Sequence, residues 1–328
     1  MRAIDHRPGG DVSCIRLTDL EAPTPRAGEL AIRVSYAGVN RPDLLQRLGQ
    51  YPAPPDASPL MGLEVSGEVI SAGNPLHQHL VGTRVCALTP GGGYAEVVTA
   101  PVAHCLPIPR GLDLRTAACL PETMLTVWAN LIERGQLRAG QRVLIHGGSS
   151  GIGTTAIQFA RWAGAQQIFT TVGSPEKALV CSELGAHRAI LYKTEDFQQI
   201  IKDETQGEGV HLVLDMVGGP YMSKHLRCLA PDGRLVQIGF MAGSEATLDW
   251  SLLLVKRLTL TGSTLRARSH DEKARLCKSL QTSIWPELEK GRLLPLIHAE
   301  FPLEDAARAH ALMESSSHIG KIVLRVNP

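Results

Sequence analysis

The sequence lacks the features that would place the protein in a membrane or on nucleic acid. None of its apolar runs approaches the roughly 20 residues that a membrane helix needs. It has no dense run of Lys and Arg, and 33 basic side chains nearly balance 32 acidic ones, for a net charge of +1. That balance argues against nucleic acid as a main partner. The first residues, MRAIDHR, are charged and strand-like and do not resemble a signal peptide. We therefore expect a cytoplasmic protein.

Closely spaced cysteine pairs are also missing. The seven cysteines, at positions 14, 86, 105, 119, 181, 228 and 277, are odd in number and widely scattered, with no C-x-x-C motif. This distribution excludes a disulfide framework and is typical of a reduced compartment. We expect each cysteine to be a small packing residue, because free cysteines are usually buried.

The most informative stretch that is present runs from Arg142 to Gly164. Arg142–His146 is predicted to be a short buried strand, and Thr154–Gly164 has apolar residues at helical spacing. Between them lies a turn with the spacing Gly148-x-x-Gly151-x-Gly153. Such a turn is compatible with a purely structural strand–helix connection. With a strand before it and a helix after it, the turn favours a dinucleotide site, because bare backbone N–H groups and a positive helix end can hold a diphosphate.

The next strand indicates which dinucleotide is bound. NAD-selective sites usually place an acid about 20 residues beyond the glycines, where it binds the ribose hydroxyls. Here Gly173 stands at that place, followed by Ser174 and, three residues on, Lys177. A hydroxyl and an ammonium suit a 2′-phosphate, so we expect NADPH. Ser174 can equally cap the following helix, and both roles are compatible.

The hydrophobic period divides the chain into an outer part and an inserted part. Residues 1–121 are predicted to be rich in β-strands, with Pro and Gly clusters between them, and strands return after about residue 290. Between these segments strands and helices alternate, which predicts a parallel, doubly wound sheet. We expect an α/β protein, with a nucleotide-binding domain at 122–289 inserted into a β-rich domain made of 1–121 and 290–328. The strand Leu258–Gly262 is expected at the sheet edge, where pairing with a second copy would cover it.

Several motifs resemble the zinc-free branch of the medium-chain dehydrogenase/reductases, and within it the quinone oxidoreductases related to zeta-crystallin, including their tumour-suppressor-inducible subgroup. They span nearly the whole length and are GVNRPDLLQR from Gly38, GLEVSGEV from Gly62, PETMLTVW from Pro121, VLIHGGSSGIG from Val143 and IGKIVL from Ile319. The resemblance implies a GroES-like catalytic domain, a Rossmann domain, a cleft between them, NADPH as cofactor and a homodimer.

The resemblance also assigns site residues. It implies that Asn40 and Tyr51 lie at the nicotinamide end, as the catalytic candidates, with the hydroxyl of Thr126 nearby. The remaining cofactor positions that it implies, together with those of the glycine turn and the following strand, are Gly148, Ser150, Gly151, Ile152, Gly153, Gly173, Ser174, Lys177, Tyr192, Gly239 and Phe240. Without the resemblance, Tyr51 would be interpreted as a loop-packing aromatic and Tyr192 as part of a solvated strand end.

The residues that would hold zinc in the related alcohol dehydrogenases are replaced. Asn40 stands in place of a Cys and Leu63 in place of a His, and neither is a preferred zinc ligand. Only Cys86 and Cys105 lie near 85–110, where a four-cysteine structural site would fall. We therefore expect no metal, and we expect the lone acid Glu64 to be structural or hydrogen-bonded.

Three functions remain open from the sequence. The first is NADPH-dependent reduction of small quinones. The second is NADPH-dependent reduction of α,β-unsaturated carbonyls, which the same group includes. The third is a nucleotide-binding protein with low turnover and a structural role.

Overall fold

The computed structural model describes residues 1–327, which form two compact units. The first contains Met1–Leu125 and Leu265–Pro328, and the second contains Thr126–Thr264. The division therefore differs from the expected one at its second boundary, because residues 265–289 cluster with the first unit. Helix α9 (His270–Glu289) explains the difference: it buries Leu276, Leu280 and Ile284, and the Trp285 indole N–H donates to the carbonyl of Pro107 in that unit at 2.8 Å. Among residues 1–327, no helix is long and apolar enough to cross a membrane.

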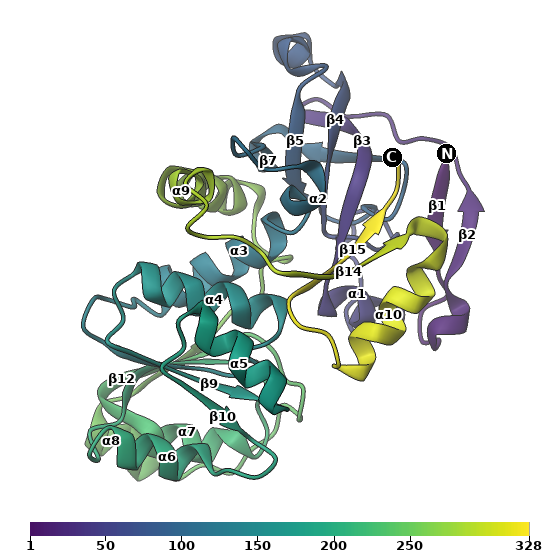
Figure 1. Cartoon of the computed structure of the whole chain (residues 1–328). Coiled ribbons are helices and arrows are strands. Elements are labelled where there is room, and N and C mark those ends of the chain that lie inside the picture. The colour runs from purple at the N-terminus through teal and green to yellow at the C-terminus, as the bar shows by residue number, and fades with distance from the viewer. Residues whose placement is uncertain (328) are drawn as a thin grey trace. The chain divides into compact units, whose positions relative to one another are not determined.

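The first unit is built on a seven-stranded sheet (Figure 1). Its order is β14-β15-β3-β4-β5-β7, with β6 also paired to the long central strand β3. The strands are β3 (Glu29–Val39), β4 (Glu64–Ala72), β5 (Arg84–Leu88), β6 (Val97–Pro101), β7 (Cys105–Pro107), β14 (Ile297–Pro302) and β15 (Lys321–Arg325). β15 pairs antiparallel with the last residues of β3, so the C-terminal segment lies beside the end of β3, where α1 begins.

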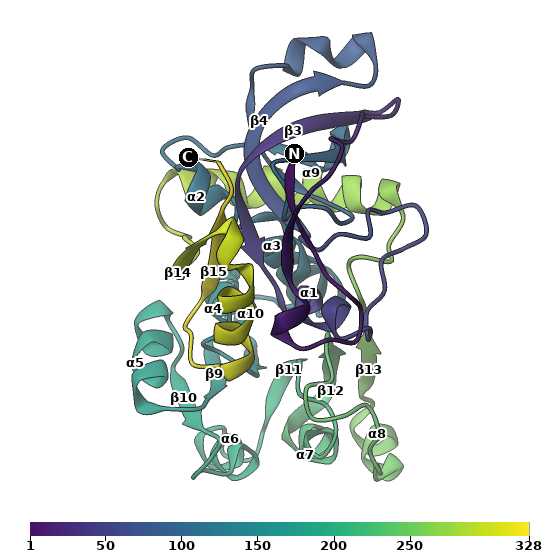
Figure 2. The same cartoon turned by 90° about the vertical axis from the view of Figure 1, so that its right-hand side faces the viewer.

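Five α-helices and a separate strand pair also belong to the described part of the first unit. β1 (Arg2–Asp5) pairs antiparallel with β2 (Arg16–Asp19). The helices are α1 (Arg41–Arg47), α2 (Leu114–Ala117), α3 (Pro121–Val127, which ends in the second unit), α9 and α10 (Ala306–Ser315). Figure 2 shows α10 beside β14 and β15, the two strands that it contacts. The core brings together apolar side chains of the sheet and of α10, among them Ile32, Val65, Leu324 and Ala309. Side chains on the inward face of the strands, where successive residues point to opposite faces, thus form the core of the expected β-rich domain.

The second unit is the predicted doubly wound sheet. Its six strands are parallel and follow the order β10-β9-β8-β11-β12-β13, which reverses direction between β8 and β11. Figure 1 shows α4 and α5 on one face, and α6, α7 and α8 on the other. The strands are β8 (Arg142–Ile145), β9 (Gln167–Val172), β10 (Arg188–Leu191), β11 (Val210–Asp215), β12 (Leu229–Gln237) and β13 (Thr259–Gly262). The helices are α4 (Gly151–Trp162), α5 (Pro175–Leu184), α6 (Phe197–Glu204), α7 (Tyr221–Cys228) and α8 (Trp250–Lys256).

This strand order places ligand-binding loops at one edge of the sheet. In open parallel sheets, ligands bind beyond the carboxyl ends of the strands at the point where the order reverses. The glycine turn follows β8, and the segment 216–219 follows β11, so both border that point. Helix α3 is followed directly by a π-helix at Trp128–Arg134.

Candidate functional site

The glycine turn of the second unit is shaped first by the packing of its own chain. A Cβ on Gly148 would lie 1.9 Å from Thr170 Oγ1, and a Cβ on Gly153 would lie 2.2 Å from the carbonyl oxygen of Gly147. Gly147 has a φ of +65°, which non-glycine residues rarely adopt. Close approach of a phosphate is therefore not the only reason for these glycines, because helix α4 could not pack against β8 and β9 without them.

The start of α4 nevertheless offers unpaired donors. Ser150 caps the helix, its Oγ accepting from the N–H of Gly153 at 3.0 Å. Within residues 1–327, the backbone N–H groups of Gly151 and Ile152 have no intramolecular acceptor. The N-terminus of a 12-residue helix with free N–H groups attracts anions. The turn therefore fits a diphosphate, and Gly148, Ser150, Gly151, Ile152 and Gly153 lie together there.

A second group of predicted cofactor-binding residues lies at the start of α5. Ser174 caps this ten-residue helix, its Oγ accepting from the N–H of Lys177 at 3.4 Å, so the capping role is present. The hydroxyl of Tyr192 lies 3.0 Å from where a Cβ on Gly173 would stand. Lys177 is half-buried, and burial lowers its pKa while the charge of Lys193 lowers it further. A half-exposed tyrosine and two nearby lysines thus surround the position where an NAD-binding site would carry an acid.

The loops after β11 and β12 are held together by backbone hydrogen bonds. The N–H of Met241 donates to the carbonyl of Met216 at 3.0 Å. Phe240 is 54% exposed and lies close to Gly218, where an added Cβ would be 2.8 Å from the ring. Gly239 precedes it, just beyond the end of β12. Gly239 and Phe240 therefore lie beyond the carboxyl end of β12.

Thr126 lies at the start of the second unit, in the last turn of α3. Thr126 is half-buried, and its carbonyl accepts from Asn130 Nδ2 at 2.9 Å. These contacts do not assign a role to its hydroxyl, which remains a prediction. Of the predicted residues, Asn40 and Tyr51 belong to the first unit and all the others belong to the second.

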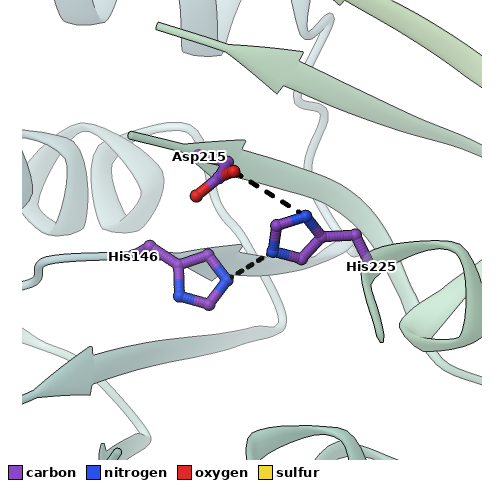
Figure 3. Close-up of side chains that lie close together, drawn as sticks. All are labelled: His146, Asp215 and His225. Atoms are coloured by element: carbon purple, nitrogen blue, oxygen red, sulfur yellow. Dashed lines mark hydrogen bonds and ion pairs between the residues drawn. The ribbon is translucent and has the colours of Figure 1, made fainter. Parts of the chain in front are cut away.

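A buried histidine pair lies under the glycine turn, and sequence reasoning missed it. Figure 3 shows His146 Nε2 and His225 Nε2 facing each other at 2.9 Å, with Asp215 Oδ2 3.8 Å from Nδ1 on the opposite side of the His225 ring. Within residues 1–327, this is the one group of His, Cys, Asp and Glu whose ligating atoms approach closely enough to consider a metal. Because the three side chains form a row and do not converge on one centre, the arrangement favours a hydrogen-bonded core.

The row connects elements that carry the ligand-binding loops. His146 follows β8 and shares a 2.9 Å hydrogen bond, through Nδ1, with Thr171 Oγ1. Asp215 ends β11 and accepts from the N–H groups of Val217 and Gly218 at 2.8 and 2.9 Å. Burial lowers the pKa of His225 to about 4 and that of His146 well below its ordinary value. Both imidazoles are therefore neutral at pH 7.

In the first unit, Asn40 is the centre of a buried polar group. Its Nδ2 donates to Glu64 Oε1 at 2.9 Å, and its Oδ1 accepts from the Lys321 ammonium at 2.6 Å. Lys321 also donates to Glu64 Oε1 at 2.7 Å and to the carbonyl of Val39 at 3.1 Å. The second Glu64 oxygen accepts from the N–H of Glu122 at 2.9 Å. Glu64 is thus hydrogen-bonded, as expected, and the Asn40 amide is held in one orientation.

Asp43 supports the same region from the first turn of α1. Its carboxylate accepts from the N–H groups of Asn40 and Gly62 at 2.8 and 3.0 Å and from the Tyr94 hydroxyl at 3.1 Å. Burial raises the pKa of Asp43 to about 6, although these hydrogen bonds oppose the rise. A Cβ on Gly62, where φ is +102°, would lie 2.5 Å from the backbone nitrogen of Tyr94. Close backbone packing therefore fixes the chain around Gly62. The Gly62 N–H, which donates to Asp43, is fixed with it.

Tyr51 lies beside a cation that sequence reasoning missed. The Arg266 guanidinium carbon is 5.6 Å from the centre of the half-buried Tyr51 ring. Arg266 is fixed by the carbonyl of Pro90, at 3.1 and 2.9 Å, and by Gln46 Oε1 at 2.8 Å. Burial raises the pKa of Tyr51, and the charge of Glu122 raises it further. The hydroxyl of Tyr51 donates to no side chain or backbone group within residues 1–327, so it is available to a ligand.

Comparison with known proteins gives two family matches. The alcohol dehydrogenase GroES-like domain model matches residues 26–110, and the zinc-binding dehydrogenase model matches residues 151–281. The quinone oxidoreductase of Rattus norvegicus is 31% identical over 327 residues, which cover 99% of this chain and 97% of that protein.

Solved structures of oxidoreductases are also similar to this chain over nearly its whole length. The quinone oxidoreductase of Thermus thermophilus, solved alone and with NADPH, has a TM-score of 0.84 and 31% identity over 99% of this chain and 100% of that chain. The CurK enoyl reductase has a TM-score of 0.87 and 28% identity over 99% of each chain. Sequence similarity also extends to a mycocerosic acid synthase-like polyketide synthase of Mycolicibacterium smegmatis, at 31% identity over 99% of this chain, which spans 15% of the length of that protein.

Proposed function

Because the chain belongs to the medium-chain dehydrogenase/reductase family, among its zeta-crystallin-like quinone oxidoreductases, we propose that it transfers hydride from NADPH to small quinones. The observation that carries the cofactor assignment is the group at the start of α5. Gly173 stands where an acid would repel a 2′-phosphate, and the neighbouring Ser174, Lys177 and Tyr192 supply a capped helix end, an ammonium and a hydroxyl. The NADPH complex of the Thermus relative supports the same cofactor.

Each cofactor group has a matching set of residues in the second unit. The free N–H groups of Gly151 and Ile152, at the positive end of α4, bind the diphosphate. Thr126, Gly239 and Phe240 bind the nicotinamide half. When bound, NADPH supplies the hydride, and the protein's part is to orient the reactants and to stabilise the oxyanion that forms on the acceptor.

The acceptor groups are Asn40 and Tyr51 in the first unit. The Tyr51 hydroxyl is free to donate to a quinone oxygen, and Arg266 beside its ring favours negative charge there. The Asn40 amide is held by Glu64 and Lys321, so it presents one fixed edge. A quinone readily takes electron density onto oxygen and needs little more than positioning and one or two donors.

We also propose that the site works without zinc. The Lys321 ammonium already lies 2.7 Å from Glu64 Oε1 and 2.6 Å from Asn40 Oδ1. A divalent cation at this place would be repelled by that ammonium, and an amide and Leu63 would be poor ligands for it.

A second candidate is the reduction of α,β-unsaturated carbonyls. The similarity to the CurK enoyl reductase over 99% of the chain favours it, since the two reactions share a fold and a hydride donor. They differ in where hydride arrives, at the β-carbon of an enone and at a carbonyl oxygen of a quinone. Which of the two acceptors the protein reduces therefore distinguishes the two proposed reactions.

We propose a cytoplasmic homodimer that pairs through the sheet edge of the second unit. β13 is the last strand of its sheet, and the neighbouring helix α8 exposes Trp250, Leu254 and Val255 at 60%, 77% and 74%. An unpaired edge beside exposed apolar side chains is a liability that a two-fold axis would remove.

A substrate panel tests the proposal. Oxidation of NADPH is followed by absorbance with 1,2-naphthoquinone, a set of enones and a set of saturated ketones. We expect turnover with the quinone and little with the ketones, which need stronger polarisation. Tyr51→Phe should lower kcat by about 10–100-fold, as for the loss of about 1.4–2.7 kcal/mol of transition-state stabilisation, with a smaller change in NADPH affinity. Turnover of ketones but not of quinones would exclude the assignment, and an unaffected Tyr51→Phe would exclude only the role of Tyr51.

A further inference from the structure

A small cavity in the first unit is lined by ionisable side chains, and the proposed hydride transfer leaves all of them except Arg266 without a role. It has a volume of about 10 Å³. Apolar walls come from Leu63, Leu88 and Leu265, and the polar lining includes Glu122, Arg266, Lys273 and His104. Each of these four residues is more than nine-tenths buried. Such a concentration of ionisable groups in the interior is costly unless the groups are paired or neutral.

Glu122 is the group whose carboxyl remains without a partner. It is 8% exposed, and its backbone N–H donates to Glu64 Oε2 at 2.9 Å. Its own carboxyl oxygens make no hydrogen bond or ion pair with residues 1–327. Lys273, the one lysine in the lining, donates to the carbonyl of Arg266 at 2.6 Å instead. An unpaired buried carboxyl is stable as the neutral acid, which carries a proton it can donate.

Burial, reinforced by two neighbouring carboxylates, keeps that proton on Glu122 at neutral pH. Burial raises the pKa of Glu122 to about 8, and the negative charges of Glu64 and Asp43 raise it too, while the ammonium groups of Lys321 and Lys273 lower it. The cavity is also lined by Arg266, His104 and His270, and the Arg266 guanidinium lies beside the Tyr51 ring. A general acid is most effective when its pKa lies near the working pH.

The cavity adjoins the place proposed for the acceptor. Arg266 lines the cavity, and its guanidinium carbon lies 5.6 Å from the centre of the Tyr51 ring. When Glu122 is ionised, its charge raises the pKa of the Tyr51 phenol, so the two groups are close enough to interact. Glu122, Arg266 and Tyr51 thus form one cluster, in which a cation and a hydroxyl can stabilise an oxyanion and a carboxylic acid can neutralise it.

We propose that Glu122 is the proton donor that completes reduction of the acceptor, an assignment that rests on the proposed function. Hydride from NADPH carries two electrons to the quinone and leaves a hydroquinone monoanion. The O–H bond of Glu122 breaks, a new O–H bond forms on the anionic oxygen, and Glu122 is left as a carboxylate. Solvent then returns the proton to Glu122. The net reaction consumes NADPH, one proton and one quinone, and yields NADP⁺ and hydroquinone.

The test compares wild-type protein with Glu122→Gln and Glu122→Asp, using NADPH and 1,2-naphthoquinone. Gln keeps the size of the neutral acid but has no acidic proton, and Asp retains one. We expect wild-type kcat to fall as pH rises through about 8. Glu122→Gln should lose at least about 100-fold in kcat and should also lose this pH midpoint. Glu122→Asp should keep a midpoint at a reduced rate, and NADPH affinity should be unchanged in both variants.

An infrared titration gives a readout that does not need turnover. The band of a protonated carboxyl should be present at neutral pH, should titrate near the kinetic midpoint, and should be absent in Glu122→Gln. Glu68→Gln, at a half-exposed acid on β4 that only approaches Arg33 at 4.0 Å, is the matched control and should change neither activity nor this band.

The outcomes separate the two proposals. If the wild type reduces neither quinones nor enones, the proposed function and the role of Glu122 both fall. If it reduces quinones and Glu122→Gln keeps both the rate and the pH midpoint, only the proton-donor assignment is overturned. A carboxyl band that is absent at neutral pH would overturn it as well, because an ionised Glu122 has no proton to give.

Discussion

Replacing Lys321 with Met should destabilise the first unit strongly. Lys321 is 3% exposed and Glu64 is fully buried, and their charged atoms are 2.7 Å apart. Burial lowers the pKa of Lys321, but Glu64, Cys119 and Asp43 together raise it above its ordinary value, so the ammonium is charged at any physiological pH. The substitution leaves the Glu64 carboxylate buried without its cation.

The expected cost follows from that uncompensated charge. Removing one member of a buried pair typically costs about 3–5 kcal/mol, because the remaining ion keeps its desolvation penalty. Asn40 Oδ1 and the Val39 carbonyl also lose their donor. The double variant Lys321→Met/Glu64→Gln should recover much of the loss, since it removes the buried charge as well as the ammonium.

Urea unfolding measures the effect, provided that the two units are followed separately. A single two-state free energy is not well defined for a chain with two units. Trp285 is the one tryptophan of the first unit, while Trp128, Trp162 and Trp250 belong to the second. Fluorine NMR of fluorotryptophan-labelled protein therefore reports each unit on its own signals.

Lys278→Met is the matched control, because Lys278 is exposed on α9. It should change the free energy of unfolding by no more than about 0.5 kcal/mol. A loss below about 1 kcal/mol in Lys321→Met, or a double variant as unstable as the single one, would refute the reasoning. Either result would mean that water reaches Glu64 once the ammonium is gone.

Three further predictions concern the cofactor, the histidine pair and the dimer. Wild-type protein should bind NADPH much more tightly than NADH in fluorescence-quenching titrations, and Lys177→Ala should reduce the difference between the two affinities. Equal affinities of the wild type for NADPH and NADH would contradict the 2′-phosphate site. Because the pKa of His225 is lowered to about 4 in the folded protein, the unfolded chain binds more protons between about pH 6.5 and 4, and stability should fall as pH falls through that window, by at most about 1.4 kcal/mol per pH unit. His225→Asn should make the dependence of unfolding free energy on pH shallower, and an unchanged slope would exclude His225 as its source. Light scattering should give a dimer mass for the wild type and a monomer mass for Leu254→Glu, whereas a wild-type monomer at micromolar concentration would exclude pairing at this edge.

Local sequence patterns were sufficient for the fold class. The alternation of strands and helices predicted the parallel doubly wound sheet, and the glycine turn lies at the junction of β8 and α4, with Gly151 and Gly153 in the first turn of the helix. These features depend on neighbours a few residues apart, namely hydrophobic period, capping and the conformational freedom of glycine. The same information located the start of α5 and its cap, Ser174.

The limits of that approach appear at α9 and at the cavity. The sequence assigned residues 265–289 to the nucleotide-binding part, because nothing local distinguishes a helix that packs on one unit from a helix that packs on the other. Its attachment depends on Trp285 and the buried face of α9. Arg266 and Lys273 reach the cavity only because that segment returns to the first unit.

Long-range contacts decided the chemistry of the site. The sequence predicted that Asn40 is a poor zinc ligand and that Glu64 is structural or hydrogen-bonded, but it did not indicate that Lys321, near the other end of the chain, joins them. Nor did it show that His146 and His225 meet, or that the carboxyl of Glu122 lacks a partner. The identity of each strand and turn is set by interactions within a few residues. The charge state of a buried group depends on every charge and every layer of protein around it, and the tertiary structure alone brings these together.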